Sequence, residues 1–338
     1  MNRRGRSRIV ARVVALAAVL AGAASCRTCA EEAPAASDAG IVSDVARLGT
    51  ERAATRTLAT LHAPLDALAE GKAILFGVDR THGVVLAIRE EGDGAGSVQE
   101  IAHGEHEPFA IVVRAGKPVW ASRDGIFASN EDGGQRVTLV DDHEIRALGA
   151  GPHDVVFADA HGISRVEWPA ARKPVLIVPD VVADEVVATV EAILWLERGP
   201  GKVGSYDLKS GVKKELAAEE RKPHDLAVAG DLHSITWHEG ESDLLPGRPP
   251  RAFVADTQSG VVRELAGTWD SRASYAIFGG CLVGPGVCKP VSGVDWVTET
   301  PGPKTGIAVF DSVHVSWVEE SGGDAWRIVS MPLSACCR

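Results

Sequence analysis

The sequence has few of the side chains that build aromatic recognition surfaces, with only two tyrosines and two methionines in 338 residues. It also lacks the short motifs of several enzyme classes, since no GxSxG, P-loop, Rossmann fingerprint or HExxH occurs in it. No amphipathic stretch with a helical period follows the first fifty residues. These absences argue against a large aromatic binding surface, against those enzyme classes and against a helical domain.

The chain is acidic, with a formal net charge of −11 at pH 7. Five arginines lie at positions 3, 4, 6, 8 and 12, and without them the net charge falls to about −16. A negative surface repels polyanions, so we expect neither nucleic acid nor an anionic membrane surface as a partner. The acidic excess is better explained as a solubility feature than as a binding site.

The N-terminus has the pattern of an export signal. Its arginines precede an apolar run, residues 13–24, that is too short and too rich in alanine to span a membrane well. The run ends in Ala23-Ala24-Ser25-Cys26, which resembles the lipobox of bacterial lipoproteins. That resemblance implies cleavage before Cys26 and acylation of its thiol. The family usually has leucine where Ala23 stands, so cleavage without lipidation is the alternative.

The residue after the cysteine is Arg27, where aspartate would signal retention in the inner membrane. The lipoprotein resemblance therefore implies an outer-membrane anchor, and otherwise a periplasmic or secreted protein. We expect three parts: an export signal over residues 1–25, a lipid-anchored flexible tether over 26–50, and a folded domain over 51–338. The tether is rich in Ala, Pro, Ser and acidic residues.

Export would place the cysteines where disulfides persist. Cys281 and Cys288 flank a short hairpin-like segment, and we predict a disulfide between them. A second bridge from Cys29 to Cys336 or Cys337 is a further hypothesis. With Cys26 acylated, five cysteines remain, so one stays unpaired. A metal site is a weaker explanation because no CxxC pair is repeated.

A hairpin whose second strand carries an aromatic residue recurs about every 40 residues. The intervals between successive aromatics are 44, 37, 38, 42 and 80 residues. The six aromatics are Phe76, Trp120, Phe157, Trp195, Trp237 and Trp317. Repeats of this length indicate stacked four-stranded units, typically propeller blades, and the doubled interval leaves room for one degenerate unit.

We therefore predict an all-β fold, a seven-bladed β-propeller. A strand within residues 55–61 has no partner of its own and would complete the last blade, closing the ring. A small residue recurs in the inner strands, where the blades crowd together: Ala67, Ala110, Ala147, Ala188, Ala227, Ala276 and Ala308. Six blades is the alternative, if the unit at residues 275–298 is an elaborated loop. A pair of β-sandwiches would not explain the period.

The second unit, residues 108–140, resembles the repeat of bacterial lipoprotein propellers of the NHL and YWTD-like kind. The resemblance extends over about 280 residues and is strong in two or three units. The tyrosine of that family's aromatic pair is absent throughout. The resemblance implies a propeller, usually without known enzymatic activity, and no specific ligand.

One set of polar residues stands before the inner strands of units two to five, where loops would surround one mouth of the central channel. The set is His106, Glu107, His143, Glu144, Glu185, His224 and Asp225. Imidazoles and carboxylates converging there could hold a divalent metal or a polar ligand on the axis. The alternative, which we favour, is that loop entries simply prefer polar side chains that face solvent.

These observations favour a non-catalytic, exported, lipid-anchored propeller that binds a protein, glycan or small ligand. We expect a monomer that needs no cofactor and meets the membrane only through its lipid. The alternative is a metal-dependent hydrolase or lyase, similar to the gluconolactonase and virginiamycin B lyase propellers. Its candidate residues are His106, His143, His224, Glu107 and Glu185. The carboxylate and asparagine spacing of those enzymes cannot be traced here, and the sequence shows no catalytic residue.

Overall fold

The chain divides into two units, Met1–Thr50 and Glu51–Arg338. All residues that the computed structural model describes belong to the second unit. They are residues 56–90, 96–141, 144–151, 153–168, 173–217, 223–228, 234–239, 251–265, 276–278, 281–284, 287–290, 308–310, 314–322 and 325–332. Every regular element among them is a β-strand. The described part of the chain contains no helix long and apolar enough to cross a membrane.

The described strands form seven antiparallel sheets, six with four strands and one with three. Sheet 1 contains β2 (Ala67–Gly71), β3 (Ile74–Asp79), β4 (Val84–Glu90) and β5 (Gly96–Ala102). Sheet 2 contains β6 (Ala110–Arg114), β7 (Lys117–Ser122), β8 (Gly125–Ala128) and β9 (Val137–Asp141). Sheet 3 contains β10 (Ala147–Ala150), β11 (Asp154–Asp159), β12 (Gly162–Glu167) and β13 (Val175–Pro179).

Sheet 4 contains β14 (Glu185–Ala188), β15 (Ala192–Glu197), β16 (Lys202–Asp207) and β17 (Lys213–Ala217). Sheet 5 contains β18 (His224–Val228), β19 (Ser234–Glu239), β20 (Arg251–Asp256) and β21 (Val262–Leu265). Sheet 6 contains β22 (Ala276–Phe278), β23 (Cys281–Gly284) and β24 (Val287–Pro290). Sheet 7 contains β25 (Ala308–Phe310), β26 (His314–Gly322), β27 (Ala325–Pro332) and β1 (Arg56–Leu61).

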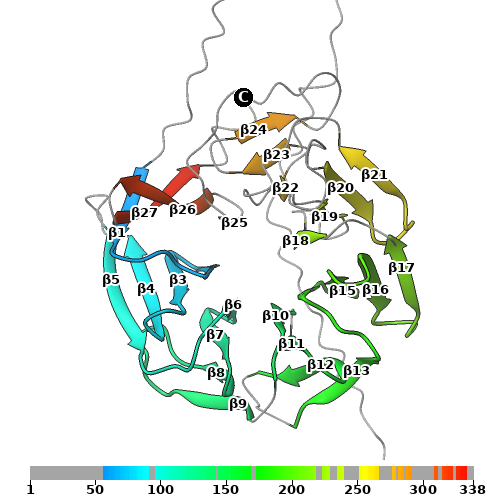
Figure 1. Cartoon of the computed structure of the whole chain (residues 1–338), viewed down its shortest axis with the longest axis horizontal. Coiled ribbons are helices and arrows are strands. Elements are labelled where there is room, and N and C mark those ends of the chain that lie inside the picture. The colour runs from blue at the N-terminus through cyan, green and yellow to red at the C-terminus, as the bar shows by residue number, and fades with distance from the viewer. Residues whose placement is uncertain are drawn as a thin grey trace, which may run out of the picture. The chain divides into compact units, whose positions relative to one another are not determined.

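Within sheets 1 to 6 each strand pairs with the next one in sequence, so every sheet is an up-and-down meander. The first strand of one sheet contacts the first strand of the next: β25 with β2, β2 with β6, β6 with β10, β10 with β14, β14 with β18, and β18 with β22. Figure 1 shows these first strands innermost, with the fourth strands on the outside. This is the predicted all-β propeller arrangement.

The core lies between neighbouring sheets. Trp120 of sheet 2 packs on sheet 1, where it joins Phe76 and Phe127 in one buried cluster. Phe157, Trp195 and Trp237 fill the next three interfaces in the same way, and each is at most 1% exposed. Burying a side chain of this size contributes several kcal/mol, on the order of 3–5 when judged by truncation to alanine. The repeated aromatic therefore supplies the contact between successive blades.

The structure corrects the predicted alignment in the first sheet. In sheets 2 to 5 the aromatic directly precedes the residue that pairs with the first residue of the inner strand. The same position in sheet 1 is Gly77, because Val78 pairs with Ala67. Phe76 lies one residue earlier and so faces the opposite side. Leu65 occupies the space that Gly77 leaves, since a Cβ on Gly77 would lie 2.5 Å from its Cδ1.

The recurring alanines do not share one position either. Ala67, Ala110 and Ala147 are first residues of their inner strands, whereas Ala188 is the last residue of β14. The inner strand of sheet 4 begins instead with Glu185, which pairs with Leu196. The presence of an alanine in each inner strand was therefore mistaken for a common register, although the alanine lies 10 residues before the aromatic in sheet 2 and 7 residues before it in sheet 4.

The N-terminal strand pairs as predicted. β1 runs antiparallel to β27 and forms the outermost strand of sheet 7. Leu58, Ala59 and Leu61 are buried against sheet 1, in a cluster with Leu75 and Ile88. A strand from the start of the domain thus belongs to the sheet built from its end.

The backbone of sheet 6 does not support the predicted disulfide. Cys288 pairs with Val283, while Cys281 pairs with Pro290, so the two cysteines are diagonal neighbours rather than direct partners. Diagonal neighbours lie roughly 7–8 Å apart, which is longer than an unstrained disulfide accommodates. The side chains of these cysteines, and all of Cys26, Cys29, Cys336 and Cys337, lie outside the described residues.

Candidate functional site

A cluster of charged side chains lies where sheets 1 and 2 meet. The cluster, which we call the Glu107 cluster, consists of Arg80, His106, Glu107, Ser122, Arg123 and Asp124. Arg80 follows β3 directly and Arg123 follows β7 directly, so both arginines begin the turn after a second strand. His106 and Glu107 come from the loop that leads into β6.

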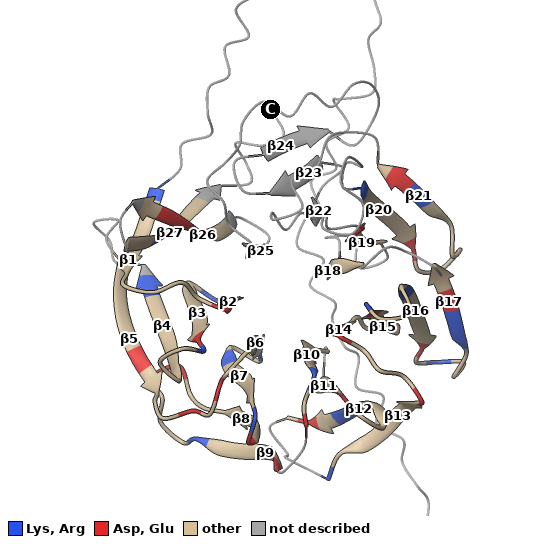
Figure 2. Cartoon of the chain, viewed as in Figure 1, with Lys and Arg blue, Asp and Glu red and all other residues tan. Residues whose placement is uncertain are grey.

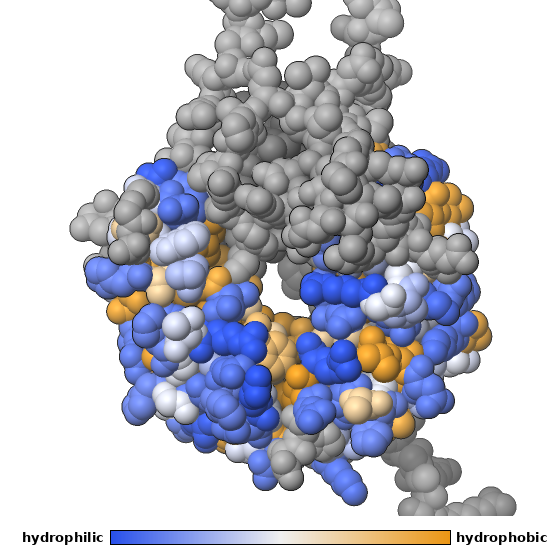
Figure 3. Space-filling model, in the orientation of Figure 1, coloured by the Kyte–Doolittle hydropathy of each residue, from blue (hydrophilic) through white to orange (hydrophobic). Residues whose placement is uncertain are grey.

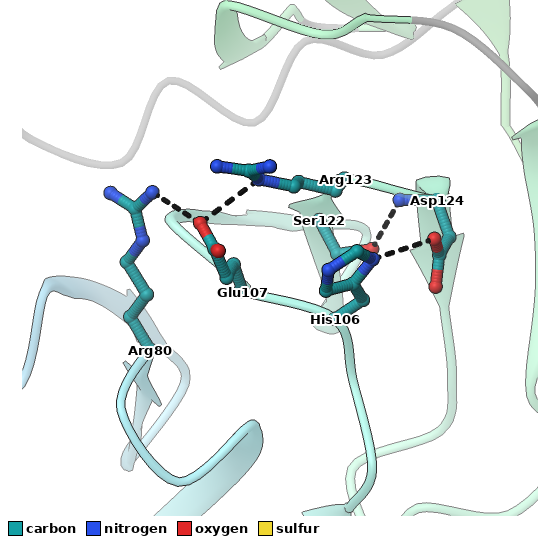
Figure 4. Close-up of polar contacts among 6 residues, drawn as sticks. All are labelled: Arg80, His106, Glu107, Ser122, Arg123 and Asp124. Carbon is teal, nitrogen blue, oxygen red and sulfur yellow. Dashed lines mark hydrogen bonds and ion pairs between the residues drawn. The ribbon is translucent and has the colours of Figure 1, made fainter.

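The two arginines share one carboxylate oxygen. Nη2 of Arg80 donates to Oε2 of Glu107 at 2.6 Å, and Nε of Arg123 lies 2.9 Å from the same atom. Figure 4 shows the two guanidinium groups on either side of this oxygen. Glu107 therefore links a turn of sheet 1 to a turn of sheet 2.

A second pair stands beside the first. Nδ1 of His106 lies 3.1 Å from Oδ1 of Asp124, and the backbone N–H of Asp124 donates to Oγ of Ser122 at 3.1 Å. The carbonyl of His106 accepts a hydrogen bond from the N–H of Arg123 at 2.9 Å. In Figure 4 Asp124 lies on the opposite side of His106 from Glu107. The cluster thus has a cationic end and an anionic end with an imidazole between them.

The cluster is open to solvent, and its contacts stabilise the ionised forms of Glu107 and Arg80. The side chains of Arg80 and Arg123 are 48% and 60% exposed, and that of Glu107 is 36% exposed. The hydrogen bond from Arg80 holds the pKa of Glu107 below its ordinary value, with a smaller contribution from the charge of Arg123. The same bond raises the pKa of Arg80. The three side chains therefore carry one net positive charge at neutral pH.

The loop that carries Glu107 is held at a neighbouring residue. Glu105 is buried, and its carboxylate accepts two hydrogen bonds from Arg136, at 3.1 Å and 3.2 Å. The guanidinium carbon of Arg136 in turn lies 4.0 Å from the ring centroid of Phe127. The N–H of Glu105 donates to the carbonyl of Gly83 at 3.0 Å. These contacts fix the loop against sheet 1 and sheet 2.

Related contacts join sheets 3, 4 and 5. Nη2 of Arg198, the residue after β15, donates to Oε1 of Glu185 at 2.7 Å. The other oxygen of Glu185 accepts the backbone N–H of Leu226 in sheet 5 at 2.7 Å. Asp184 accepts the N–H of Arg198 at 2.8 Å and lies 3.8 Å from the guanidinium of Arg146, which precedes sheet 3. Carboxylates at the inner strands therefore link neighbouring sheets repeatedly.

The predicted site residues separate into these different junctions. His106 and Glu107 lie together between sheets 1 and 2, whereas Glu185 lies between sheets 4 and 5. Glu144 is exposed ahead of β10. Glu185 and His224 are first residues of inner strands rather than loop residues, which corrects their predicted equivalence to Glu107.

The remaining members of the set bear less on the site. The ring centroid of His224 lies 5.7 Å from that of His238 on the next strand. His143 and the side chain of Asp225 lie outside the described residues. Within the described ranges, no group of three His, Cys, Asp or Glu side chains could hold a metal ion.

Sequence reasoning missed the arginines. Arg80, Arg123 and Arg198 each follow a second strand immediately, in the pairs Asp79-Arg80, Ser122-Arg123 and Glu197-Arg198. Aligning the ends of the second strands, rather than the aromatics, would have revealed this pattern. Figure 2 shows acidic and basic residues intermixed at the strand ends rather than in areas of one sign. On the face shown in Figure 3, a strip of apolar residues near the centre lies between two groups of hydrophilic residues.

No protein-family model matches the chain, and no curated protein matches it. Its structural neighbours are propellers. The WD40 β-propeller domain of Doa1 covers 85% of this chain and all of its own length, at a TM-score of 0.61 and 11% identity. Virginiamycin B lyase from Staphylococcus aureus covers 82% of this chain and 98% of its own, at a TM-score of 0.59 and 13% identity.

A streptogramin B lyase gives the same TM-score of 0.59, at 11% identity, and covers 82% of this chain and 96% of its own. Proteins this different in sequence share a fold without necessarily sharing a site. The fold is therefore a β-propeller. The neighbours include both a lyase and a WD40 domain, so fold similarity alone does not choose between catalysis and binding.

Proposed function

We propose that the chain is a non-catalytic binding module that takes a protein, glycan or small ligand at the loops around its inner strands. The observation that carries this proposal is that the candidate carboxylates already accept hydrogen bonds from other residues of the protein. Glu107 accepts from two arginines, and Glu185 accepts from Arg198 and from the N–H of Leu226. Carboxylates used in this way build a rigid platform. They are poorly placed to collect a metal or to serve as a general acid or base.

We further propose that the seven sheets are seven blades, with β1 closing the ring. Pairing of β1 with β27 and the contact of β25 with β2 support this count. A closed ring would hold the loop platform rigid, since β1 covers the edge of β27 and joins the start of the domain to its last sheet.

Export and anchoring through Cys26 complete the proposed role, with the propeller displayed at the outer membrane or in the periplasm. The lipobox-like Ala23-Ala24-Ser25-Cys26 supports this. Mass spectrometry of the mature protein is expected to find an acylated Cys26 as its first residue. An unmodified N-terminus upstream of Cys26 would point to secretion instead.

A hydrolase or lyase is the second candidate, and one observation favours it. Asp124 orients the ring of His106, which is 57% exposed in its side chain, as an acid orients a catalytic base. The hydroxyl of Ser122, the nucleophile this pair would need, is fully buried and accepts the N–H of Asp124. Among the described residues no group of three His, Cys, Asp or Glu side chains could hold a metal ion. The binding function accordingly remains the better supported of the two.

The two functions differ in what they predict for a ligand screen. Protein purified without chelator is first assayed for bound divalent metal. It is then screened by thermal shift against glycans, peptides and small organic acids. A binding module is expected to be stabilised by one ligand class, to leave that ligand chemically unchanged and to contain less than stoichiometric metal. Turnover of the ligand that is abolished in His106→Ala would replace the binding function with the enzymatic one.

A further inference from the structure

The Glu107 cluster presents more hydrogen-bond donors than it uses. A guanidinium group carries five N–H donors. In the contacts within this cluster, Arg80 uses Nη2 and Arg123 uses Nε, both on Oε2 of Glu107. In Figure 4 the terminal nitrogens of Arg123 lie above the carboxylate of Glu107, farther from Asp124 than from Arg80, and no dashed line reaches them. The paired Nη groups of arginine form the fork that matches a carboxylate or a phosphate.

We propose that the guanidinium groups of Arg80 and Arg123 bind an oxyanion, which is a carboxylate or phosphate group of the ligand of this module. The inference rests on the proposed binding function and names the chemistry that its site recognises. Glu107 holds the two cations side by side, so the donors are positioned before the ligand arrives. Preorganised donors lose less side-chain entropy on binding than free arginines do.

The backbone at Glu107 supports a role beyond packing. Glu107 has a φ of 49°, in the left-handed region that non-glycine residues seldom adopt. Such strain persists where surrounding contacts impose it, and it occurs preferentially at binding and catalytic sites. Here the buried Glu105 anchors the preceding part of the loop. The conformation of Glu107 then places its carboxylate between the two arginines.

Two nearby carboxylates must be weighed against an anion. Asp66 accepts the backbone N–H of Arg80 at 2.7 Å, and Asp124 is 61% exposed in its side chain. Both would repel an oxyanion at long range. Asp124 lies at the far end of the cluster behind His106, however, and Arg123 contacts neither carboxylate in the described structure. We therefore place the oxyanion at the terminal nitrogens of Arg80 and Arg123, on the side of the cluster away from His106 and Asp124.

Sheet 4 supplies a matched comparison at the same structural position. Arg198 also follows a second strand and also donates to a carboxylate, that of Glu185. That carboxylate's other oxygen accepts the backbone N–H of Leu226 from the next sheet. The exposed fractions are similar, at 54% for Arg198 and 60% for Arg123. Only the junction of sheets 1 and 2 combines two cations on one acid among these contacts.

The test uses the full chain with ¹⁵N-labelled arginine and follows the Nε–H resonances by NMR at constant ionic strength. Inorganic phosphate and acetate are the probes. Titration is expected to shift the Arg80 and Arg123 resonances saturably, with dissociation constants in the millimolar range. Arg123→Gln is expected to weaken binding about tenfold, because it removes the charged fork. Arg123→Lys keeps the charge and is expected to restore part of the affinity. Arg198→Gln is expected to leave the affinity unchanged.

Several results would overturn the assignment. Linear, unsaturable shifts would mean that no site exists. Equal weakening by Arg198→Gln and Arg123→Gln would reduce the effect to general electrostatics. A ligand from the thermal-shift screen that binds the wild type and Arg123→Gln alike would refute the oxyanion site while leaving the binding function intact. Melting temperatures of all variants are measured alongside, so that loss of folding is separated from loss of binding.

Discussion

Glu107 combines a strained backbone conformation with a charged side chain that two arginines contact. Glu107 adopts a positive φ, yet its carboxylate accepts two strong contacts from Arg80 and Arg123. A charge-assisted hydrogen bond of this kind is stronger than a neutral one, so it helps offset the backbone strain. The same contacts set the ionisation of the cluster, because they are available only to the deprotonated carboxylate.

The carboxyl group of Glu107 is expected to titrate at a lower pH than an ordinary glutamate. Its pKa is lowered first by the hydrogen bond from Arg80 and next by the charge of Arg123. A group with a depressed pKa stabilises the fold above its unfolded pKa, near 4.3, and loses that contribution as the pH falls through the folded pKa. NMR titration of the side-chain carboxyl carbon should show this, and Arg80→Gln should raise the pKa toward its ordinary value. An unchanged pKa in the variant would contradict the structure.

The sequence predicted part of this cluster. His106 and Glu107 were singled out because polar residues before inner strands are visible in a linear alignment. Their partners were not, since Arg80 lies 27 residues before Glu107 and on a different sheet. Nothing in the sequence states that Glu107 links two sheets rather than pointing into the channel. That choice depends on the register of β3 and β7, which a sequence pattern does not reveal.

At the level of elements, the same turn connects the third and fourth strands of sheets 4 and 5. Asp207 and Asp256 stand at the ends of β16 and β20, and each Oδ1 accepts two backbone N–H groups in the following turn. The hydroxyl of a serine three residues on, Ser210 or Ser259, donates to the same oxygen at 2.8 Å. A glycine with positive φ, Gly211 or Gly260, completes each turn. The repeated D-x-x-S-G sequence therefore determines the hairpin between third and fourth strands.

A glycine also sets the position of one aromatic. Trp195 pairs with Gly204 across sheet 4, and a Cβ on Gly204 would lie 2.2 Å from Cζ2 of the indole ring. The ring crosses the strand there, and its Nε1 donates to Oε1 of Glu197 at 3.1 Å. Lys213 lies 5.5 Å from the ring centroid on the outer side. The indole is thus enclosed by its neighbours and has little freedom to move.

Gly204→Ala is expected to destabilise the domain by about 1–3 kcal/mol, the usual cost of overpacking a core. The new methyl group must displace an indole ring that is only 1% exposed. Gly199→Ala is the matched control, because a Cβ there meets nothing within 4 Å. Urea unfolding followed by tryptophan fluorescence measures both variants. If both variants unfold at the same urea concentration, the indole ring does not lie across Gly204.

Strand positions were predictable because each strand is short, apolar and bounded by turn residues. A strand was expected within residues 55–61, and β1 is Arg56–Leu61. The side of the sheet on which each side chain lies, and the pairing register of the strands, were predicted less well. Phe76 matches the other aromatics in its sequence context, but Leu65 takes the aromatic's space and Gly77 its position. A one-residue shift of this kind reverses the face and leaves the pattern unchanged.

On the scale of the whole molecule, stability depends on interfaces between sheets. Buried apolar clusters fill the interfaces from sheet 7 to sheet 1 and onward to sheet 5. Carboxylate contacts link sheets 1 and 2, sheets 3 and 4, and sheets 4 and 5. The interface between sheets 7 and 1 differs because one of its strands comes from the start of the domain. Leu58 and Leu61 of β1 pack there with Leu75 and Ile328. Segments from the start and from the end of the domain, β1 and β27, are thereby held together.

Deleting residues 51–61 is therefore expected to destabilise the whole domain and not only its first strand. Each buried leucine contributes about 2–5 kcal/mol by truncation, and a domain has roughly 5–15 kcal/mol in total. The loss also uncovers the edge of β27, so aggregation should increase. Circular dichroism melts of the truncated and full chains measure the effect, with deletion of residues 26–50 as the control.

A synthetic peptide of residues 51–62 added to the truncated chain should restore much of the lost melting temperature, because it can pair with β27 and refill the cluster. Equal melting of truncated and full chains would show that β1 contributes nothing to holding sheets 7 and 1 together.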